Sequence, residues 1–320
     1  MILIVTLNPL LEKRLTYNTV YYGSVNRNPS FVKKPGGKGI NVSRQLKRLG
    51  LPSYNLIFSG GIDGKIYRDI LRKEGFEYST IQIESETRFA TIVIDQKTNL
   101  ITSYFSNDPV VSKKETDEFI AKLEKMIRNC EMVIFSGSAP EGTARIIMEG
   151  IEIANKYDKV SVCDTYGAYL SESIKASPTI IHNNFDEIYA SLNLPLGNEQ
   201  EVLSVLNAFY DQGIKRTYLT NGSHTFYASN FNYHYKIHPP GINSIDSTGS
   251  GDSFVAGIIY GWHNNLVFED SLRFATALAA INAATFEVSN VNPDEARSLS
   301  TSVKIENVGK KLKAIDDSPH

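Results

Sequence analysis

The chain has 320 residues, of which 42% are hydrophobic and 21% charged, a composition typical of a globular protein with a large buried core. Its 33 Lys and Arg against 35 Asp and Glu give a formal net charge of -2, which excludes the global basic field that nucleic-acid-binding proteins use. Cys130 and Cys163 lie far apart beside apolar runs, so we expect reduced, buried thiols and no disulfide framework.

Targeting and membrane signals are missing from the sequence. No run reaches the roughly 18 apolar residues of a membrane span, and the first residues lack the basic region of a signal peptide. We therefore expect a cytoplasmic protein that binds neither membrane nor nucleic acid. Without an internal repeat or a linker rich in Pro, Gly or Ser, we expect a single domain over residues 1–320.

Short β-branched runs alternate with helical patterns along most of the chain. Residues 1–7 form a continuous apolar run, which indicates a strand buried on both faces. Residues 40–49 have helical spacing and precede Gly50, a common helix stop. The alternation predicts an α/β fold with a mainly parallel sheet. Further strands are expected at 55–58, 132–135, 160–163, 179–181 and 217–219, and further helices at 65–74, 116–129, 141–157 and 201–212.

Two segments, 17–32 and 87–105, break this rhythm with alternating and β-branched residues and no helix between them. They predict a small separate sheet, with lid strands at about residues 10–34 and 86–108 inserted into the domain. Such a lid excludes water from a site that transfers a reactive group.

A glycine-rich turn carries the strongest chemical signal: Asp246-Ser-Thr-Gly-Ser-Gly-Asp252, followed by an apolar helical pattern. Its glycines allow backbone N–H groups to converge on an anion at a helix N-terminus. Asp252 cannot bind a phosphate, but it can accept a proton from an attacking hydroxyl, as phosphoryl transfer requires. An ordinary turn with Asp252 as helix cap explains the spacing equally well.

A second glycine-rich segment, Pro35-Gly-Gly-Lys-Gly-Ile-Asn41, precedes the helix at 40–49. It matches neither a Walker A loop nor a dinucleotide fingerprint. Its glycines would let a small ligand approach the backbone, with Asn41 bonding hydroxyls and Lys38 supplying positive charge. A loop tightened only for packing is the alternative.

Taken in chain order, these motifs resemble the PfkB (ribokinase-like) family of carbohydrate kinases over nearly the whole chain, in particular its 1-phosphofructokinase and tagatose-6-phosphate kinase branch. The resemblance implies a three-layer α/β domain with a mainly parallel central sheet and a small β-sheet lid. The matching segments are Thr6–Pro9, Val25–Arg27, Gly36–Asn41, Thr87–Arg88, Ser136–Pro140 and Gly249–Asp252.

The resemblance implies a role for each matching position at the reaction centre. Asp252 matches the catalytic base, and Gly249, Ser250 and Gly251 match the anion hole. Lysine and arginine at matching positions suit the phosphate already on the sugar, because their charges complement a dianion. The positions implied for the sugar phosphate are Glu12, Arg27, Gly37, Lys38, Asn41 and Arg88.

The nucleotide side follows from the same resemblance. Asn184 and Glu187 match an Asn-x-x-Glu element that helps hold the water shell of Mg²⁺, a metal that takes few protein ligands. Thr220 and Gly222 match a nucleotide-side loop, and Asn282 lies in a helix that borders adenine. ATP and Mg²⁺ are the implied cofactors, and a monovalent cation is left open.

The chain also departs from the family pattern. Glu12 stands where Asp is usual, His182 replaces the Lys of a Lys-Pro-Asn segment, Ala90 stands where Asn is frequent, and Thr225 replaces a glycine. None of these changes touches Asp252, so we expect catalysis to be retained and the choice of sugar to be affected.

The resemblance thus implies an ATP-dependent kinase that converts fructose 1-phosphate or tagatose 6-phosphate to the bisphosphate. Two alternatives stay open: a catalytically impaired protein that binds sugar phosphate and nucleotide, and a kinase of an unphosphorylated sugar. Exposed edges and an apolar face of the lid strands predict a homodimer through the lids, which the resemblance also implies.

Overall fold

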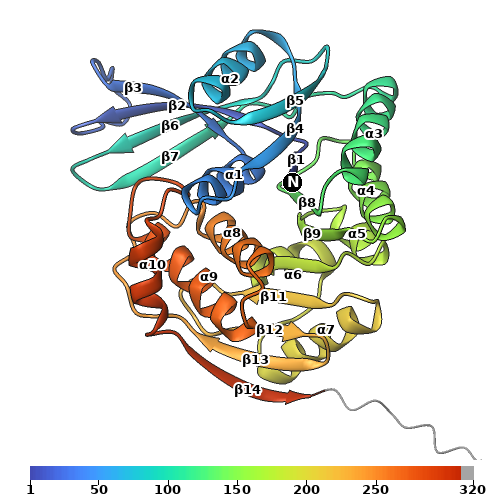
Figure 1. Ribbon diagram of the computed structural model, residues 1–320. Coiled ribbons are helices and arrows are strands. Elements are labelled where there is room, and N and C mark those ends of the chain that lie inside the picture. Colours follow the sequence, from blue (N-terminus) through green and yellow to red (C-terminus); the bar gives the residue numbers. More distant parts are fainter. Residues whose placement is uncertain (311–320) are drawn as a thin grey trace, which may run out of the picture.

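The structure is a computed structural model and describes residues 1–310 (Figure 1). A ten-stranded sheet crosses the molecule in the order β14-β13-β12-β11-β10-β9-β8-β1-β4-β5. Neighbouring strands from β5 to β11 pair in parallel, and β12, β13 and β14 add an antiparallel edge. The strands are β1 (Ile2–Thr6), β4 (Ser53–Ser59), β5 (Glu77–Gln82), β8 (Met132–Ser136), β9 (Val160–Asp164), β10 (Ile180–Asn184), β11 (Arg216–Thr220), β12 (Phe226–Asn230), β13 (Tyr233–His238) and β14 (Lys304–Lys310).

Helices cover both faces of the sheet and complete three layers (Figure 1). One apolar cluster joins the sheet to α3, α4, α5, α6 and α7, and another joins it to α1, α8 and α9. The helices are α1 (Lys38–Arg48), α2 (Gly61–Lys73), α3 (Lys113–Arg128), α4 (Arg145–Lys156), α5 (Leu170–Lys175), α6 (Phe185–Leu192), α7 (Glu199–Asp211), α8 (Ser250–His263), α9 (Phe268–Ala283) and α10 (Pro293–Ser300).

The central strand β1 shows why its sequence is apolar throughout. Leu3 and Val5 pack in the cluster on one face of the sheet, whereas Ile2 and Ile4 pack in the cluster on the other. Side chains of a strand alternate between faces, so a strand covered by helices on both sides has no position left for a polar residue. The predicted buried parallel strand is confirmed.

A smaller four-stranded sheet, here called the lid, projects beside the large one (Figure 1). Its order is β3-β2-β6-β7, with β2 and β6 parallel at its centre. Leu11 of β2 packs with Tyr67 and Leu71 of α2, which attaches the lid to the main domain. The lid strands are β2 (Leu10–Tyr17), β3 (Ser30–Gly36), β6 (Phe89–Asp95) and β7 (Leu100–Phe105).

Among the element boundaries that differ from the sequence expectation, two have a clear local cause. Residues 18–29, inside a segment expected to be strand, form turns and irregular loop, consistent with the turn formers Gly23, Asn28 and Pro29. Helix α4 begins at Arg145 rather than at Glu141, because Gly142 has a φ of 79° that no helix contains. Both shifts reflect local turn chemistry within correctly placed elements.

Cys130 and Cys163 are free and buried. Within residues 1–310, no helix is long and apolar enough to cross a membrane.

Candidate active site

The polar residues of the site lie where the parallel strands end. Ser136 closes β8, Asp164 closes β9, Asn184 closes β10 and Thr220 closes β11. Because parallel strands end at the same edge of a sheet, these four side chains gather on one side of the molecule. This edge is where open α/β sheets bind ligands.

Asp252 lies in the first turn of α8, opposite these strand ends. Gly249 precedes the helix with a φ of 78°, a left-handed conformation that favours glycine. The N–H groups of Gly251 and Asp252 belong to the first turn, where a helix supplies no carbonyl partners, so they can bind an anion. Asp252 is only 3% exposed, which places a carboxylate in a largely dry environment beside these amides.

Burial controls the protonation of this carboxylate. Loss of hydration raises the pKa of Asp252 to about 7, although Lys38 and the Asn41 hydrogen bond act to lower it. Asp164 acts in the same direction as burial, because a second negative charge nearby disfavours ionisation. A carboxylate with a pKa near neutrality is suited to accept a proton during a reaction.

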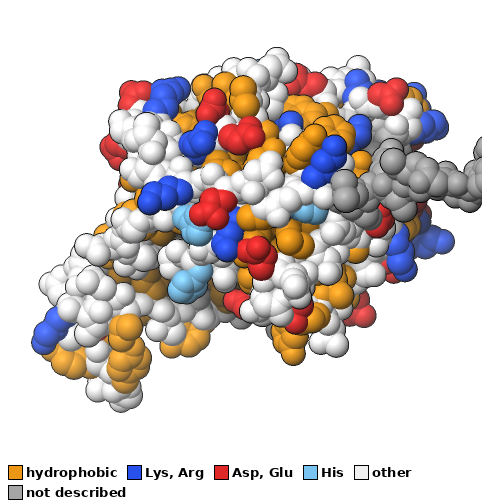
Figure 2. Space-filling model, turned by 90° about the horizontal axis from the view of Figure 1, so that it is seen from below, with side chains coloured by type: hydrophobic (Ala, Val, Ile, Leu, Met, Phe, Trp, Pro, Cys, Tyr) orange, Lys and Arg blue, Asp and Glu red, His pale blue; other side chains and the backbone are white. Residues whose placement is uncertain are grey.

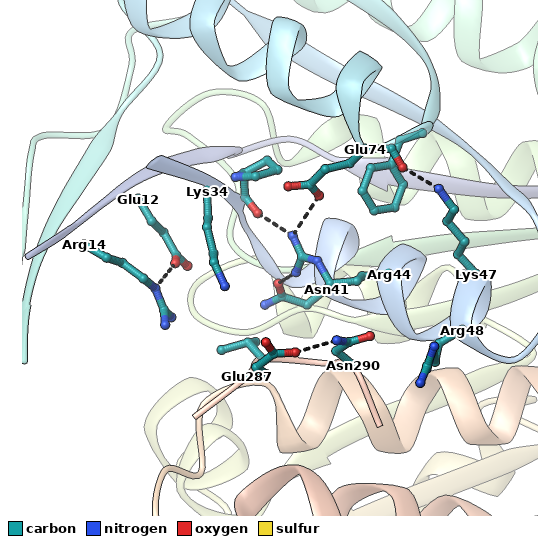
Figure 3. A pocket seen from close by; sticks show the side chains of 13 residues that line it. Glu12, Arg14, Lys34, Asn41, Arg44, Lys47, Arg48, Glu74, Glu287 and Asn290 are labelled. Carbon is teal, nitrogen blue, oxygen red and sulfur yellow. Dashed lines mark hydrogen bonds and ion pairs between the residues drawn. The ribbon is translucent and has the colours of Figure 1, made fainter. Parts of the chain in front are cut away.

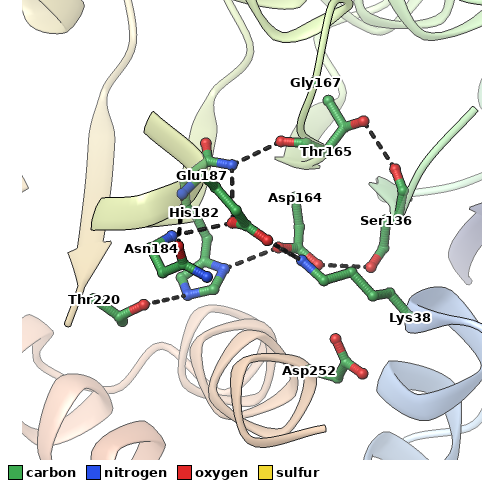
Figure 4. Close-up of polar contacts among 12 residues, drawn as sticks. Lys38, Ser136, Asp164, Thr165, Gly167, His182, Asn184, Glu187, Thr220 and Asp252 are labelled. Atoms are coloured by element: carbon green, nitrogen blue, oxygen red, sulfur yellow. Dashed lines mark hydrogen bonds and ion pairs between the residues drawn. The ribbon is translucent and has the colours of Figure 1, made fainter. Parts of the chain in front are cut away.

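Lys38 joins the two other carboxylates of the site (Figure 4). Its Nζ lies 3.2 Å from Asp164 Oδ1 and 3.1 Å from Glu187 Oε1. Burial acts to lower the pKa of Lys38, but Asp164, Glu187 and Asp252 outweigh it and raise that pKa above its ordinary value. The ammonium is therefore charged and held between carboxylates, 25% exposed at the side-chain level.

His182, which the resemblance places where a lysine is usual, bonds within the same network. Its Nδ1 lies 2.9 Å from Asp164 Oδ1, and its Nε2 lies 3.3 Å from Thr220 Oγ1. Burial acts to raise the pKa of Asp164, but Lys38 and His182 outweigh it, so that pKa lies below its ordinary value. Asp164 thus remains an anion at neutral pH, with Ser136 Oγ donating to its other oxygen at 2.7 Å.

Asn184 and Glu187 form a capping box at the start of α6. The backbone N–H of Glu187 donates to Asn184 Oδ1 at 2.7 Å, and the backbone N–H of Asn184 donates to Glu187 Oε2 at 3.1 Å. This pairing fixes the Glu187 carboxylate at the strand-end edge, where it also accepts from Lys38. The Asn-x-x-Glu spacing therefore has a structural role in addition to any role with a metal.

Asn41 and Gly37 lie on the lid side of Asp252. Asn41 Nδ2 donates to Asp252 Oδ2 at 2.8 Å. Gly37 precedes α1 with a φ of 107°, which favours glycine and turns the chain directly into the helix. Glu12, on the lid strand β2, is 8% exposed and accepts from Arg14 Nε at 2.8 Å. The structure thus brings a carboxylate of the lid and an amide of α1 to the same region.

Arg88 lies at the base of the lid and is held by the loop after β1. Its Nη2 donates to the Asn8 carbonyl at 3.1 Å, and its Nη1 pairs with Asp108 Oδ1 at 3.1 Å. Its Nε is buried and has no hydrogen-bond partner among the described residues. Such a donor in a mainly buried guanidinium suits an anionic ligand.

Three other expected site residues are exposed or hold a loop in place. Arg27 is exposed in the loop between β2 and β3, beside a cavity formed by lid residues. Gly222 follows β11, and a Cβ built on it would have no heavy atom within 4 Å, as expected of a surface loop. Asn282 is fully buried, and its side-chain amide donates to the Thr248 carbonyl at 2.8 Å, so it holds the glycine-rich loop in place.

Sequence reasoning missed Asp164 and Arg44. Asp164 binds Lys38, which is 126 positions away, and no local motif marks it. Its one signal is its place at the end of a predicted buried strand. Arg44 donates to Asn41 Oδ1 at 2.9 Å from the next turn of α1, a spacing typical of residues on one helix face.

The chain matches known proteins over most of its length. Residues 5–295 match the family model described as pfkB family carbohydrate kinase, and the chain belongs to that family. It is therefore a phosphotransferase of the carbohydrate kinase class.

Individual relatives cover almost the whole chain. A tagatose-6-phosphate kinase of Staphylococcus epidermidis is 27% identical over 92% of this chain and 96% of its own. A 1-phosphofructokinase of Borreliella burgdorferi is 29% identical over 88% of this chain and 92% of its own. The solved structure of Escherichia coli phosphofructokinase-2 with potassium has a TM-score of 0.86 and 21% identity, and covers 94% of this chain and 98% of its own. This likeness confirms the ribokinase-like fold.

Proposed function

We propose that the protein is an ATP-dependent kinase of a ketohexose phosphate, which forms a bisphosphate from fructose 1-phosphate or tagatose 6-phosphate. The observation that carries the proposal is a buried carboxylate, Asp252, beside the first-turn amides of α8 and the charged amine of Lys38. The curated relatives named above are kinases of these two sugar phosphates by name.

Phosphoryl transfer needs a base and a place for negative charge. Asp252 takes the proton of a primary hydroxyl while that oxygen forms a bond to the γ-phosphorus of ATP, and the bond to the β–γ bridging oxygen breaks to release ADP. The amides of Gly251 and Asp252, with the preceding turn at Gly249, bind the oxygens on which charge develops. Lys38 adds a positive charge that needs no proton transfer during the reaction.

Glu187 is the carboxylate proposed to support a divalent cation on the nucleotide side. Its Oε1 accepts from Lys38 and its Oε2 from the backbone N–H of Asn184, so a hard cation such as Mg²⁺, which prefers carboxylate and water oxygens, would reach it through bound water. When bound, Mg²⁺ would neutralise charge on the β- and γ-phosphates. Asn184, Thr220 and Gly222 then lie on the side where the nucleotide enters, and Asn282 supports the loop that binds its phosphates.

The turn at Asp246 could serve a monovalent cation. Asp246 Oδ1 accepts from the Thr248 amide at 2.9 Å, and the backbone of this turn is held by the Ala283 carbonyl. The structurally similar Escherichia coli phosphofructokinase-2 was solved in complex with potassium. We include potassium with ATP and Mg²⁺ in the proposed set of cofactors.

The acceptor sugar fits between the lid and α1. Glu12, Gly37 and Asn41 are the groups proposed to bind its hydroxyls. Arg88, with its unpaired buried Nε, is the strongest candidate for the existing phosphate. Lys38 could contact that phosphate only if its ammonium moved away from Asp164 and Glu187. We therefore propose that Lys38 mainly stabilises the transferred phosphoryl group.

The lid is proposed to form a homodimer. Apolar residues of the edge strands β3 and β7 are exposed, including Phe31 at 52%, Leu100 at 56% and Phe105 at 61%. In Figure 2, hydrophobic side chains lie on the surface of a lobe at the left, the side on which Figure 1 places the lid. Two such edges and faces are stabilised when a second lid covers them.

The substrate assay that tests the proposal compares kcat/KM for MgATP-dependent ADP release among acceptors. Fructose 1-phosphate, tagatose 6-phosphate, fructose 6-phosphate, fructose and ribose are each supplied at saturating MgATP. A clear preference for one ketohexose phosphate supports the proposal. Preference for a neutral sugar would contradict the role of Arg88, and ATP binding without turnover on any acceptor would favour the impaired binding protein.

A further inference from the structure

A cavity of about 460 Å³ lies between the lid, α1 and the turn at residues 287–290 (Figure 3). Its size is within the range of small-molecule sites, roughly 300–1,000 Å³. It begins beside Glu12 and Asn41 and continues along α1 as far as Arg48. Asp164 and Glu187 instead contact Lys38, the first residue of that helix. The outer part of the cavity is therefore separate from the residues assigned to catalysis.

Positive charge dominates the lining. Five cations face three carboxylates, an excess of two in a chain whose formal net charge is -2. The cations are Arg14, Lys34, Arg44, Lys47 and Arg48, and the carboxylates are Glu12, Glu74 and Glu287. A concave surface with local charge of one sign concentrates ligands of the opposite sign.

The cations differ in how they are held. Arg44 Nη2 donates to the Pro35 carbonyl at 2.8 Å, and Lys47 donates to the carbonyls of Glu74 and Gly75, so both are fixed in place. Lys34 is half-buried, and the described residues provide no hydrogen-bond or ion-pair partner for its ammonium. Its Nζ is therefore available to a ligand in the cavity.

We propose that this cavity binds a small organic anion with two acidic groups, such as a phosphorylated carboxylic acid. The excess of two positive charges matches that ligand, and the cavity is larger than one phosphate needs. Pro35, Phe76 and Val288 supply apolar walls for its carbon skeleton. Lys34 from the lid and Arg48 from α1, neither of them paired within the described residues, are the donors left for the ligand.

The cavity is linked to the reaction centre by two hydrogen bonds. Arg44 Nη1 donates to Asn41 Oδ1 at 2.9 Å, and Asn41 Nδ2 donates to Asp252 Oδ2 at 2.8 Å. A ligand that contacts both lid and α1 would also fix the separation between them. We therefore expect the bound anion to change turnover, a consequence that rests on the proposed function, whereas the binding itself does not.

The test measures binding of 2-phosphoglycolate, which carries a phosphate and a carboxylate, to the purified full-length protein by calorimetry. Lys34→Ala removes the unpaired ammonium, and Lys33→Ala removes the neighbouring lysine of β3, whose side chain lies on the opposite face of that strand. Arg88→Ala reports binding at the proposed acceptor phosphate site. We expect Lys34→Ala to weaken binding about tenfold, as loss of a charge-assisted hydrogen bond does, and the other two variants to bind like the parent.

Three results would overturn the proposal: no saturable binding to the parent protein, equal loss in the Lys33 and Lys34 variants, or loss confined to the Arg88 variant. The first result would mean that the cavity does not bind the probe. The second would mean that any positive charge on the lid suffices, and the third that the probe binds at the proposed acceptor phosphate site. Because calorimetry needs no turnover, a protein without kinase activity that still binds the probe through Lys34 would refute the proposed function and leave the anion site standing.

Discussion

Asn41 donates a 2.8 Å hydrogen bond to Asp252 across 211 positions of sequence, and so ties the first helix of the chain to the proposed catalytic base. The bond stabilises the ionised form of the carboxylate and acts to lower its pKa against the effect of burial. The orientation and the protonation of the base therefore depend on one amide.

Replacement of Asn41 tests this dependence. In Asn41→Ala the pKa of Asp252 should rise further, because the charged form loses a donor. The midpoint of the acid limb of the kcat/KM profile should then move to higher pH. Loss of sugar contacts would separately increase KM. Asn41→Ser, which retains a shorter donor, is the matched comparison. An unchanged midpoint in both variants would separate Asn41 from the ionisation of Asp252.

The parent enzyme should itself show this titration. Burial raises the pKa of Asp252 to about 7, and only the ionised form can take a proton from the acceptor. As pH falls through 7, the ionised fraction decreases, so kcat/KM should decrease about tenfold for each further pH unit. Direct measurement of ADP between pH 5 and pH 9 provides the profile. A flat profile from pH 5 to 8 is incompatible with Asp252 as the titrating base.

Arg88 should contribute to binding of the acceptor and little to binding of ATP. Arg88→Lys keeps the charge but loses the planar guanidinium, and we expect KM for the sugar phosphate to rise about tenfold, with KM for ATP nearly unchanged. Arg72→Lys, an exposed arginine of α2, is the control. Equal increases in both KM values would assign Arg88 to the nucleotide or to the lid instead.

The proposed lid interface predicts an oligomeric state. Phe105→Lys puts a charge on an apolar residue of β7 that is 61% exposed, and should convert a dimer to a monomer in light scattering after size-exclusion chromatography. Tyr189→Lys alters an aromatic residue of α6 that is 62% exposed but lies outside the lid, and should leave the dimer intact. A monomeric parent protein, or a dimer that survives the Phe105 change, would contradict the interface.

Sequence reasoning worked best where a function is local. The turn at Gly249 to Asp252 and the segment at Gly37 to Asn41 could be identified because glycine spacing and the following helical pattern lie within a few residues. The double burial of β1 was equally visible in its unbroken apolar run. In each case neighbouring residues determine the structure.

The rest of the site depends on contacts between distant elements. Lys38 was expected at the sugar phosphate, yet its ammonium lies with Asp164 and Glu187, which only the order of β9 and β10 in the sheet brings together. Asn282 could not be known as a buried support for the Thr248 turn, since its helix gives no sign of which face is covered. Sequence patterns identify candidate site residues well, but the residues that these contact are determined by the order of strands and helices in the fold.

The central claim is that Asp252 is the base of a sugar-phosphate kinase, and the turnover of Asp252→Asn tests it most directly. The asparagine amide has the same shape as the carboxylate but carries no charge. In the folded protein the pKa of the Asp252 carboxylate is raised. The contribution of Asp252 to the free energy of unfolding is present at low pH and is lost as pH rises through about 7. At pH 8 the variant should therefore be at least as stable as the parent. Its Tm at that pH shows whether it folds.

With fructose 1-phosphate or tagatose 6-phosphate, whichever the parent prefers, kcat of the variant should fall at least about 100-fold, since general bases contribute roughly 10² to 10⁴. Its affinity for ATP should change little. A folded Asp252→Asn protein that keeps the parent's kcat would contradict the account.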